Sequence, residues 1–203
     1  MSSNIQLKVP AVVWGRENEK KRTLSLLATH RCTSNSVIVS PTNAYVSEDV
    51  KKGHVNVRVR DCGLFIQKHM AFVGASPDSI VECDCCGKGV VEVKCPYKYR
   101  EVSLSDVVQN TDCCIDANFN LKQSHKWYEQ VQFQMGVINV QYCDFVYWTP
   151  IDAVICRVER NDEIITSMFA KCSQLWFDHL LPELVTRDIE NAGSNSVPHS
   201  ADE

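Results

Sequence analysis

Hydrophobic residues recur along the chain at two spacings, one typical of strands and one typical of helices. Residues 89–94 are rich in valine and stop at Cys95-Pro96, which predicts a strand. Tyr128, Val131, Met135 and Ile138 repeat at helical spacing and predict a helix over residues 124–138. The same reasoning predicts further helices over 16–29 and 163–181, and further strands over 37–39, 55–59, 63–66, 70–74, 143–149 and 154–158.

The order of these elements, with helices before, between and after groups of strands, favours an α/β fold. We expect a central mixed β-sheet flanked by helices. A chain of 203 residues fits a single domain better than two. We therefore expect a short lead over residues 1–13, one domain over 14–183, and a disordered acidic tail over 184–203.

Composition and charge limit the class of protein. The 44% hydrophobic and 23% charged residues exclude a collagen-like or mostly disordered chain. We find neither an apolar run near the ~20 residues of a membrane helix nor a secretory leader, so we expect an intracellular protein of the nucleus or cytoplasm, with no membrane partner. The odd number of cysteines, 11, then indicates reduced thiols. The net charge of −4 combines a mildly basic first 150 residues with an acidic end.

Candidate chemistry is concentrated at Asp78 and at Glu92-Val93-Lys94. Strand periodicity places Glu92 and Lys94 on one face, opposite valines. If Asp78 ends the strand that pairs with residues 89–94, two carboxylates and one ammonium meet at one end of the sheet. That set is typical of a divalent-cation site that hydrolyses phosphodiesters, because the cation offsets the repulsion between carboxylates and phosphate while the lysine acts on the attacking water.

Four segments of the chain, in this order, resemble the YqaJ viral recombinase and lambda-type alkaline exonuclease family. This family is a branch of the restriction-endonuclease-like nucleases, whose motif is Pro-Asp followed by (Asp/Glu)-x-Lys. The matching segments are Trp14-Gly15-Arg16-Glu17-Asn18-Glu19, Gly74-Ala75-Ser76-Pro77-Asp78, Glu92-Val93-Lys94-Cys95-Pro96 and Gln130-Val131-Gln132-Phe133-Gln134-Met135.

The resemblance implies a restriction-endonuclease-like core and a Mg²⁺-dependent exonuclease, with Mn²⁺ as a substitute ion. It further implies 5′-to-3′ digestion of double-stranded DNA ends in recombination or repair, a single-strand annealing recombinase as partner, and a homo-oligomer. By resemblance the metal ligands are Glu19, Asp78, Glu92 and the Val93 carbonyl, the catalytic lysine is Lys94, and Gln130 supports the site. Contacts with DNA are expected of Arg16, Ser76, Lys98 and Gln134.

Three cysteines, Cys83, Cys85 and Cys86, lie within four residues and form a candidate structural zinc site. Cys95, Cys113, Cys114 or a histidine would complete it. Because adjacent cysteines do not easily reach one tetrahedral ion, free thiols are the favoured interpretation. Two alternatives to the enzyme stay open: a catalytically silent DNA-binding domain of the same fold, and a zinc-organised interaction module.

Overall fold

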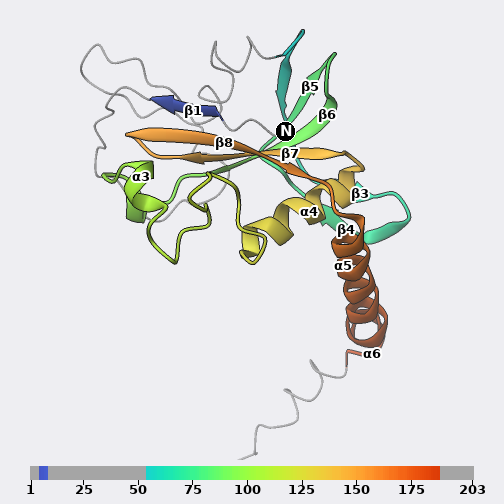
Figure 1. Cartoon of the computed structure of the whole chain (residues 1–203). Helices are drawn as coiled ribbons and strands as arrows, with labels where there is room; N and C mark the ends of the chain where they lie inside the picture. The colour runs from blue at the N-terminus through green and yellow to red at the C-terminus, as the bar shows by residue number, and fades with distance from the viewer. Residues whose placement is uncertain (1–4, 9–53, 188–203) are drawn as a thin grey trace, which may run out of the picture.

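A six-stranded sheet forms the centre of the protein in a computed structural model that describes residues 5–8 and 54–187 (Figure 1). The strand order is β1-β8-β7-β6-β5-β2. β6 and β7 pair in parallel and the other neighbours pair antiparallel, so the sheet is mixed, as predicted. The strands are β1 (Ile5–Lys8), β2 (Arg58–Asp61), β5 (Ser79–Cys83), β6 (Gly87–Lys94), β7 (Tyr142–Trp148) and β8 (Asp152–Glu159).

The described helices lie on one side of this sheet, where a small two-stranded sheet joins them (Figure 1). The helix α4 contacts both strands of the small sheet as well as β6 and β7. The small sheet consists of β3 (Phe65–Gln67) and β4 (Met70–Ala75). The helical segments are a 3-10 turn, η1 (Tyr97–Tyr99), then α3 (Leu104–Val107), α4 (Lys126–Ile138), α5 (Asp162–Leu175), a π-helical turn, η2 (Trp176–Leu180), and α6 (Leu181–Thr186).

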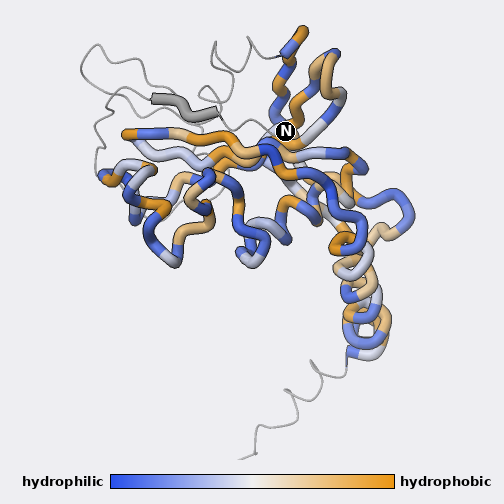
Figure 2. Tube along the Cα trace, in the orientation of Figure 1, coloured by the Kyte–Doolittle hydropathy of each residue, from blue (hydrophilic) through white to orange (hydrophobic). Residues whose placement is uncertain are grey.

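Hydrophobic residues are concentrated in the central strands and pack on both faces of the sheet (Figure 2). On the helix side, Val90 and Phe145 pack with Val131 and Met135 of α4. On the other side, Val91 packs in a second buried cluster with residues of β7 and β8. Because β6 is buried on both faces, a charged side chain on it requires polar partners. Within the described ranges, no helix combines the length and apolarity that crossing a bilayer demands.

Two of the three predicted helices lie in the described residues, and both form with different ends. The helix predicted over 124–138 is α4, which starts at 126 because the His125 side chain caps it by accepting a hydrogen bond from the Trp127 N–H at 3.2 Å. The prediction that the last helix ends at residue 181, before Pro182, is wrong. Helical structure continues to Thr186, since proline is tolerated in a first helical turn, so residues 184–186 of the expected tail are helical.

Two strands were not predicted, β1 and β5. β5 follows Asp78 directly and is buried on both faces, so its sequence does not alternate. The expectation that Asp78 ends a strand pairing with 89–94 is therefore wrong: β4 pairs with β3, and β5 pairs with β6. The strand predicted over 55–59 lies at 58–61. The predicted elements at 16–29 and 37–39, and the lead over 1–13 apart from β1, fall outside the described residues.

Candidate active site

Asp78 lies at the start of β5, against the backbone of β6. The β5–β6 ladder begins with the pair Ser79 and Val91, so the Val93 N–H lies beyond its end. The Asp78 Oδ2 accepts a hydrogen bond from this N–H at 2.7 Å. The carboxylate is thus fixed beside Glu92-Val93-Lys94, although the strand that carries it there is not the predicted one.

Glu92 is a buried carboxylate in the middle of the sheet, with a side chain only 4% exposed. Gln130 donates an amide N–H to its Oε1 at 2.7 Å, and Gln134 donates one to its Oε2 at 2.8 Å. Lys94 forms an ion pair with the same Oε1. Both carboxylate oxygens therefore have donors, which compensates the cost of burying the charge and fixes the plane of the group.

Lys94 lies at the mouth of this arrangement, with a side chain 19% exposed. Besides Glu92, its ammonium contacts the face of the Trp127 ring, 5.5 Å from the centroid. Trp127, Gln130 and Gln134 lie along one strip of α4, as the helical spacing predicts, and all three face the Glu92-Lys94 pair. The strip holds the lysine and the carboxylate in fixed positions.

Two like charges lie close together in the site. The pKa of Asp78 is raised, first by burial and second by the charge of Glu92, while the Val93 N–H and Lys94 act in the opposite direction. One ammonium thus offsets two carboxylates. Oxygen donors of like charge are the set that Mg²⁺ or Mn²⁺ favours, so the residues present fit a divalent cation.

The other residues expected at the site are exposed, buried against Glu92, or outside the described residues. Ser76 is exposed in the turn between β4 and β5, and Lys98 is exposed on η1 with its ammonium 3.5 Å from the Asp112 carboxylate. Gln134 is 3% exposed and hydrogen-bonded to Glu92, and the DNA contact predicted for it stays a prediction. Glu19 and Arg16 lie outside the described residues. Metal binding by the Val93 carbonyl stays a prediction.

The predicted zinc ligands separate into two groups. Cys83, Cys85 and Cys86 lie together at the turn between β5 and β6, but Cys95 follows the opposite end of β6 and is not part of the group. His54 takes the fourth place. Sequence reasoning allowed for a histidine without identifying this one, because 29 residues separate it from Cys83 and no periodic pattern links them.

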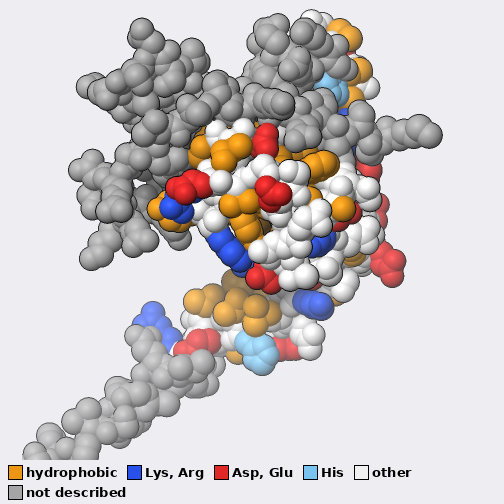
Figure 3. All heavy atoms as spheres, turned by 60° about the vertical axis from the view of Figure 1, so that its left-hand side comes forward, with side chains coloured by type: hydrophobic (Ala, Val, Ile, Leu, Met, Phe, Trp, Pro, Cys, Tyr) orange, Lys and Arg blue, Asp and Glu red, His pale blue; other side chains and the backbone are white. Residues whose placement is uncertain are grey.

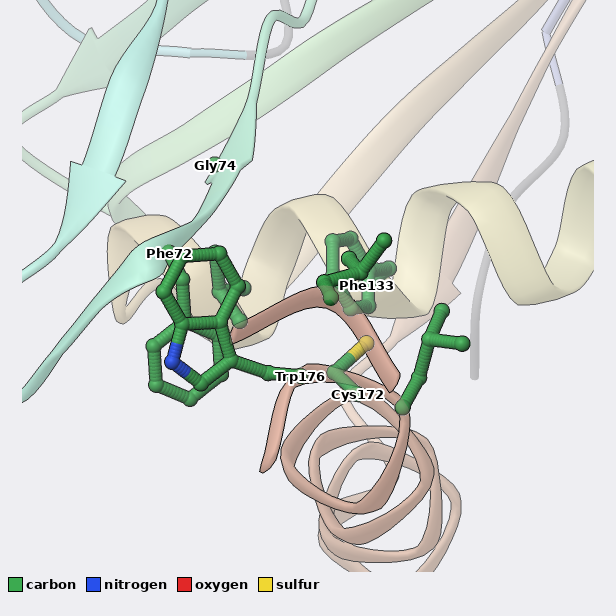
Figure 4. A pocket seen from close by; sticks show the side chains of 8 residues that line it. Phe72, Gly74, Phe133, Cys172 and Trp176 are labelled. Atoms are coloured by element: carbon green, nitrogen blue, oxygen red, sulfur yellow. The ribbon is translucent and has the colours of Figure 1, made fainter. Parts of the chain in front are cut away.

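Two further features of the described surface are a mixed distribution of charges and an apolar pocket. On the face shown in Figure 3, acidic and basic side chains are interspersed. An apolar pocket lies between β4, α4 and the last helices (Figure 4). Phe133 of α4 lines this pocket, whereas Gln134 of the same helix donates to Glu92. The pocket is lined by Phe72, Val73, Gly74, Phe133, Cys172, Leu175, Trp176 and Leu180.

Comparison with known proteins bears on this geometry. Residues 44–141 match the model of the YqaJ-like viral recombinase domain, and that range contains Asp78, Glu92, Lys94, Gln130 and Gln134. The resemblance to the YqaJ-like family is confirmed. The match spans the part of the chain in which the two carboxylates, the lysine and the glutamine strip come together.

Two curated viral proteins are also similar to the chain. An alkaline nuclease of Orgyia pseudotsugata multicapsid polyhedrosis virus is 29% identical over 122 residues, or 52% of this chain and 28% of the viral protein. An alkaline nuclease of Autographa californica nuclear polyhedrosis virus is 23% identical over 177 residues, or 79% of this chain and 40% of the viral protein. The chain therefore spans less than half the length of these two viral relatives.

The fold is shared with a solved exonuclease. The crystal structure of LHK-Exo in complex with dAMP matches with a TM-score of 0.50 and 24% identity, over 71% of this chain and 66% of that one. This match confirms the predicted α/β architecture with a central mixed sheet and flanking helices.

Proposed function

We propose that this chain is the core of a metal-dependent deoxyribonuclease that hydrolyses phosphodiester bonds at the ends of duplex DNA. The observation that carries the proposal is the buried Glu92 carboxylate, which is held by Lys94, Gln130 and Gln134 beside Asp78. A charge buried at this cost fits a role in chemistry, since apolar residues of similar size would stabilise the sheet as well or better. The similarity to viral alkaline nucleases supports the same conclusion.

Asp78 and Glu92 would hold a Mg²⁺ or Mn²⁺ ion, with the Val93 carbonyl and Glu19 as further ligands. When bound, the ion supplies positive charge for the phosphate and lowers the pKa of a coordinated water. The glutamines fix both oxygens of Glu92, so the ligand is already oriented before DNA arrives. This preorganisation lowers the cost of reaching the reacting geometry.

Lys94 acts on the attacking water and on the phosphate. Its ammonium is held between the Glu92 carboxylate and the Trp127 ring, and its partial exposure leaves donors directed toward solvent. A lysine in this position donates hydrogen bonds to a phosphate oxygen and orients the water for attack on phosphorus. Ser76 and Lys98, both exposed, are proposed to contact the DNA backbone.

The finer features of the activity follow from the resemblance to the YqaJ-like family. We propose digestion in the 5′-to-3′ direction, which leaves single strands for an annealing recombinase in DNA recombination or repair. A homo-oligomer would hold the enzyme on one DNA end through many cycles. Each of these features is separable from the cleavage chemistry in an assay.

The test is digestion of linear duplex DNA that carries a label at either the 5′ or the 3′ end, in Mg²⁺, Mn²⁺ or EDTA. We expect metal-dependent digestion that Lys94→Ala lowers by about 10²–10⁴-fold, the range for loss of a group that acts on a proton. Release of the 5′ label before the 3′ label would establish the polarity.

Lys88→Ala is the matched control, because Lys88 lies on the same strand and the same face of β6 but is exposed and far from the carboxylates. It should digest DNA like the wild type. Equal digestion by Lys94→Ala and Lys88→Ala would contradict the proposed site. DNA binding without digestion in any metal would identify a silent DNA-binding domain instead.

A further inference from the structure

The turn between β5 and β6 carries a second group of polar side chains, at the opposite end of the hairpin from Asp78. Figure 1 shows this turn beside the start of the segment that leads to β2, on the side of the sheet away from the helices. His54, Cys83, Cys85 and Cys86 meet there, and their ligand atoms all lie within 4.8 Å of one another.

The spacing of these atoms matches a tetrahedron around one ion. Zn–S bonds of ~2.3 Å and Zn–N bonds of ~2.0–2.1 Å require edges of about 3.8 Å between two sulfurs and about 3.6 Å between sulfur and nitrogen. The Sγ atoms of Cys83 and Cys85 are 3.4 Å apart, and those of Cys85 and Cys86 are 3.7 Å apart. The His54 Nδ1 lies 3.6, 3.3 and 3.4 Å from Cys83, Cys85 and Cys86.

The backbone of the turn allows adjacent cysteines to point to the same place. Gly87 has a φ of 73°, a conformation that suits glycine and closes the turn immediately after Cys86. The Asp84 N–H donates to the Val55 carbonyl at 3.0 Å, and the Asn56 amide donates to the Asp84 carboxylate at 2.6 Å. These two bonds hold the segment that contains His54 over the turn.

Donors are also directed at the sulfur atoms. The Cys86 N–H donates to the Cys83 Sγ at 3.3 Å, and the Arg157 guanidinium donates to the Cys86 Sγ at 3.3 Å. Arg157 is itself fixed by two hydrogen bonds to the buried Asp144 at 2.8 and 2.9 Å. A fixed cation and an N–H directed at thiols are typical of the groups that surround metal-bound thiolates and offset their charge.

We propose that His54, Cys83, Cys85 and Cys86 bind one structural zinc ion. Three sulfurs and one imidazole nitrogen favour zinc over Mg²⁺ or Mn²⁺, which prefer oxygen ligands. Four protein ligands fill the tetrahedron and leave no position for a substrate, so the ion is structural. It ties the segment before β2 to the hairpin whose other end carries the carboxylates. The site is independent of the proposed nuclease activity.

The first test measures metal content of the full chain, purified without added zinc, by elemental analysis and by zinc release on thiol modification. We expect one zinc per chain in the wild type, and its loss in Cys85→Ser. Cys95→Ser is the matched control, because Cys95 is also an exposed cysteine next to β6 but lies at the other end of the strand. It should retain one zinc.

A second measurement does not depend on removing a ligand. Cobalt replaces zinc in such sites, and thiolate bonds to cobalt give a charge-transfer absorption in the near ultraviolet. His54→Cys should keep the metal and raise this absorption by about a third, as three thiolates become four. Wild-type protein without stoichiometric zinc or cobalt absorption, zinc retained in Cys85→Ser, absorption unchanged in His54→Cys, or a disulfide among the three cysteines would overturn the proposal.

Discussion

The two ends of the β5–β6 hairpin carry donor sets of opposite character. At one end, Asp78 and Glu92 present carboxylate oxygens next to Lys94. At the other end, His54 and three cysteines present nitrogen and sulfur. β6 has eight residues, so the two ends are separated by roughly 25 Å at about 3.3 Å per residue. One short hairpin thus offers a site for a hard cation and, as we propose, a site for a soft one.

The two donor sets suit different roles. The carboxylate end keeps a charge imbalance, because one ammonium faces two carboxylates, and Asp78 reaches the surface although its carboxyl group is partly desolvated. Such a site can exchange its ion and admit a phosphate. The cysteine end is closed, since its ligand atoms face one another and Arg157 adds a positive charge beside them. A closed set stabilises the fold and offers nothing to a substrate.

The largest predicted effect comes from removing the charge at the carboxylate end alone. Glu92→Gln keeps the size of the side chain but removes one negative charge, so the divalent ion loses a ligand and Lys94 loses its partner. We expect DNA cleavage to fall by about 10²–10⁴-fold. Zinc content should stay at the wild-type value, since the two ends share no ligand.

The control for this change is Glu82→Gln. Glu82 lies on the neighbouring strand, β5, and its side chain is half exposed with the Arg60 guanidinium 3.6 Å away. A surface pair of this kind contributes little, so both cleavage and zinc content should be unchanged. If Glu92→Gln released zinc as well, the two ends would not be separate, and the comparison would fail.

A smaller effect should distinguish the two glutamines that hold Glu92. Gln134 is 3% exposed, so Gln134→Ala leaves a buried carboxylate oxygen without its donor, at a cost of about 1–3 kcal/mol. Gln130 is only partly buried, and water can replace its amide in Gln130→Ala. We expect thermal unfolding to show a clearly lower Tm for Gln134→Ala, and cleavage assays to show a loss of about 10–100-fold for either variant.

Glu129→Gln serves as the control for both glutamine variants, because Glu129 is the exposed neighbour on α4. Its Tm should equal that of the wild type. Equal Tm values for Gln130→Ala and Gln134→Ala would show that burial does not distinguish the two hydrogen bonds.

The smallest effect is a gain in stability. Burial and the charge of Glu92 raise the pKa of Asp78, so its ionised form destabilises the folded protein. Asp78→Asn removes that charge and should raise the Tm slightly at neutral pH, while cleavage is lost. The gain should be absent below the unfolded pKa of about 3.9, and should grow as the pH rises through the raised folded value.

Adding Mg²⁺ to the wild type and to Asp78→Asn tests whether Asp78 binds the ion. Mg²⁺ should raise the Tm of the wild type, because an ion that binds only the folded chain stabilises it, and should have a much smaller effect on Asp78→Asn. A Tm of Asp78→Asn below that of the wild type at neutral pH, or equal responses to Mg²⁺, would contradict the proposed repulsion.

Strand alternation and helical spacing in the sequence predicted which side chains share a face of one strand or one helix. The alternation along β6 placed Glu92 and Lys94 on one face, and helical spacing placed Gln130 and Gln134 on one strip. β5 was missed because a strand buried on both faces does not alternate. His54 joined the cysteines only through the hydrogen bonds between residues 55–56 and Asp84, which no local pattern records.

Because β6 pairs with β7, which comes later in the chain, β6 is synthesised before its partner strand. Both donor sets lie between His54 and Gln134, so all their described members leave the ribosome before β7 begins at Tyr142. Until β7 arrives, the backbone of β6 has an unpaired edge. Docking of β7 pairs this edge, so the sheet beneath the carboxylate end is completed only after the zinc ligands can have captured their ion and fixed the hairpin.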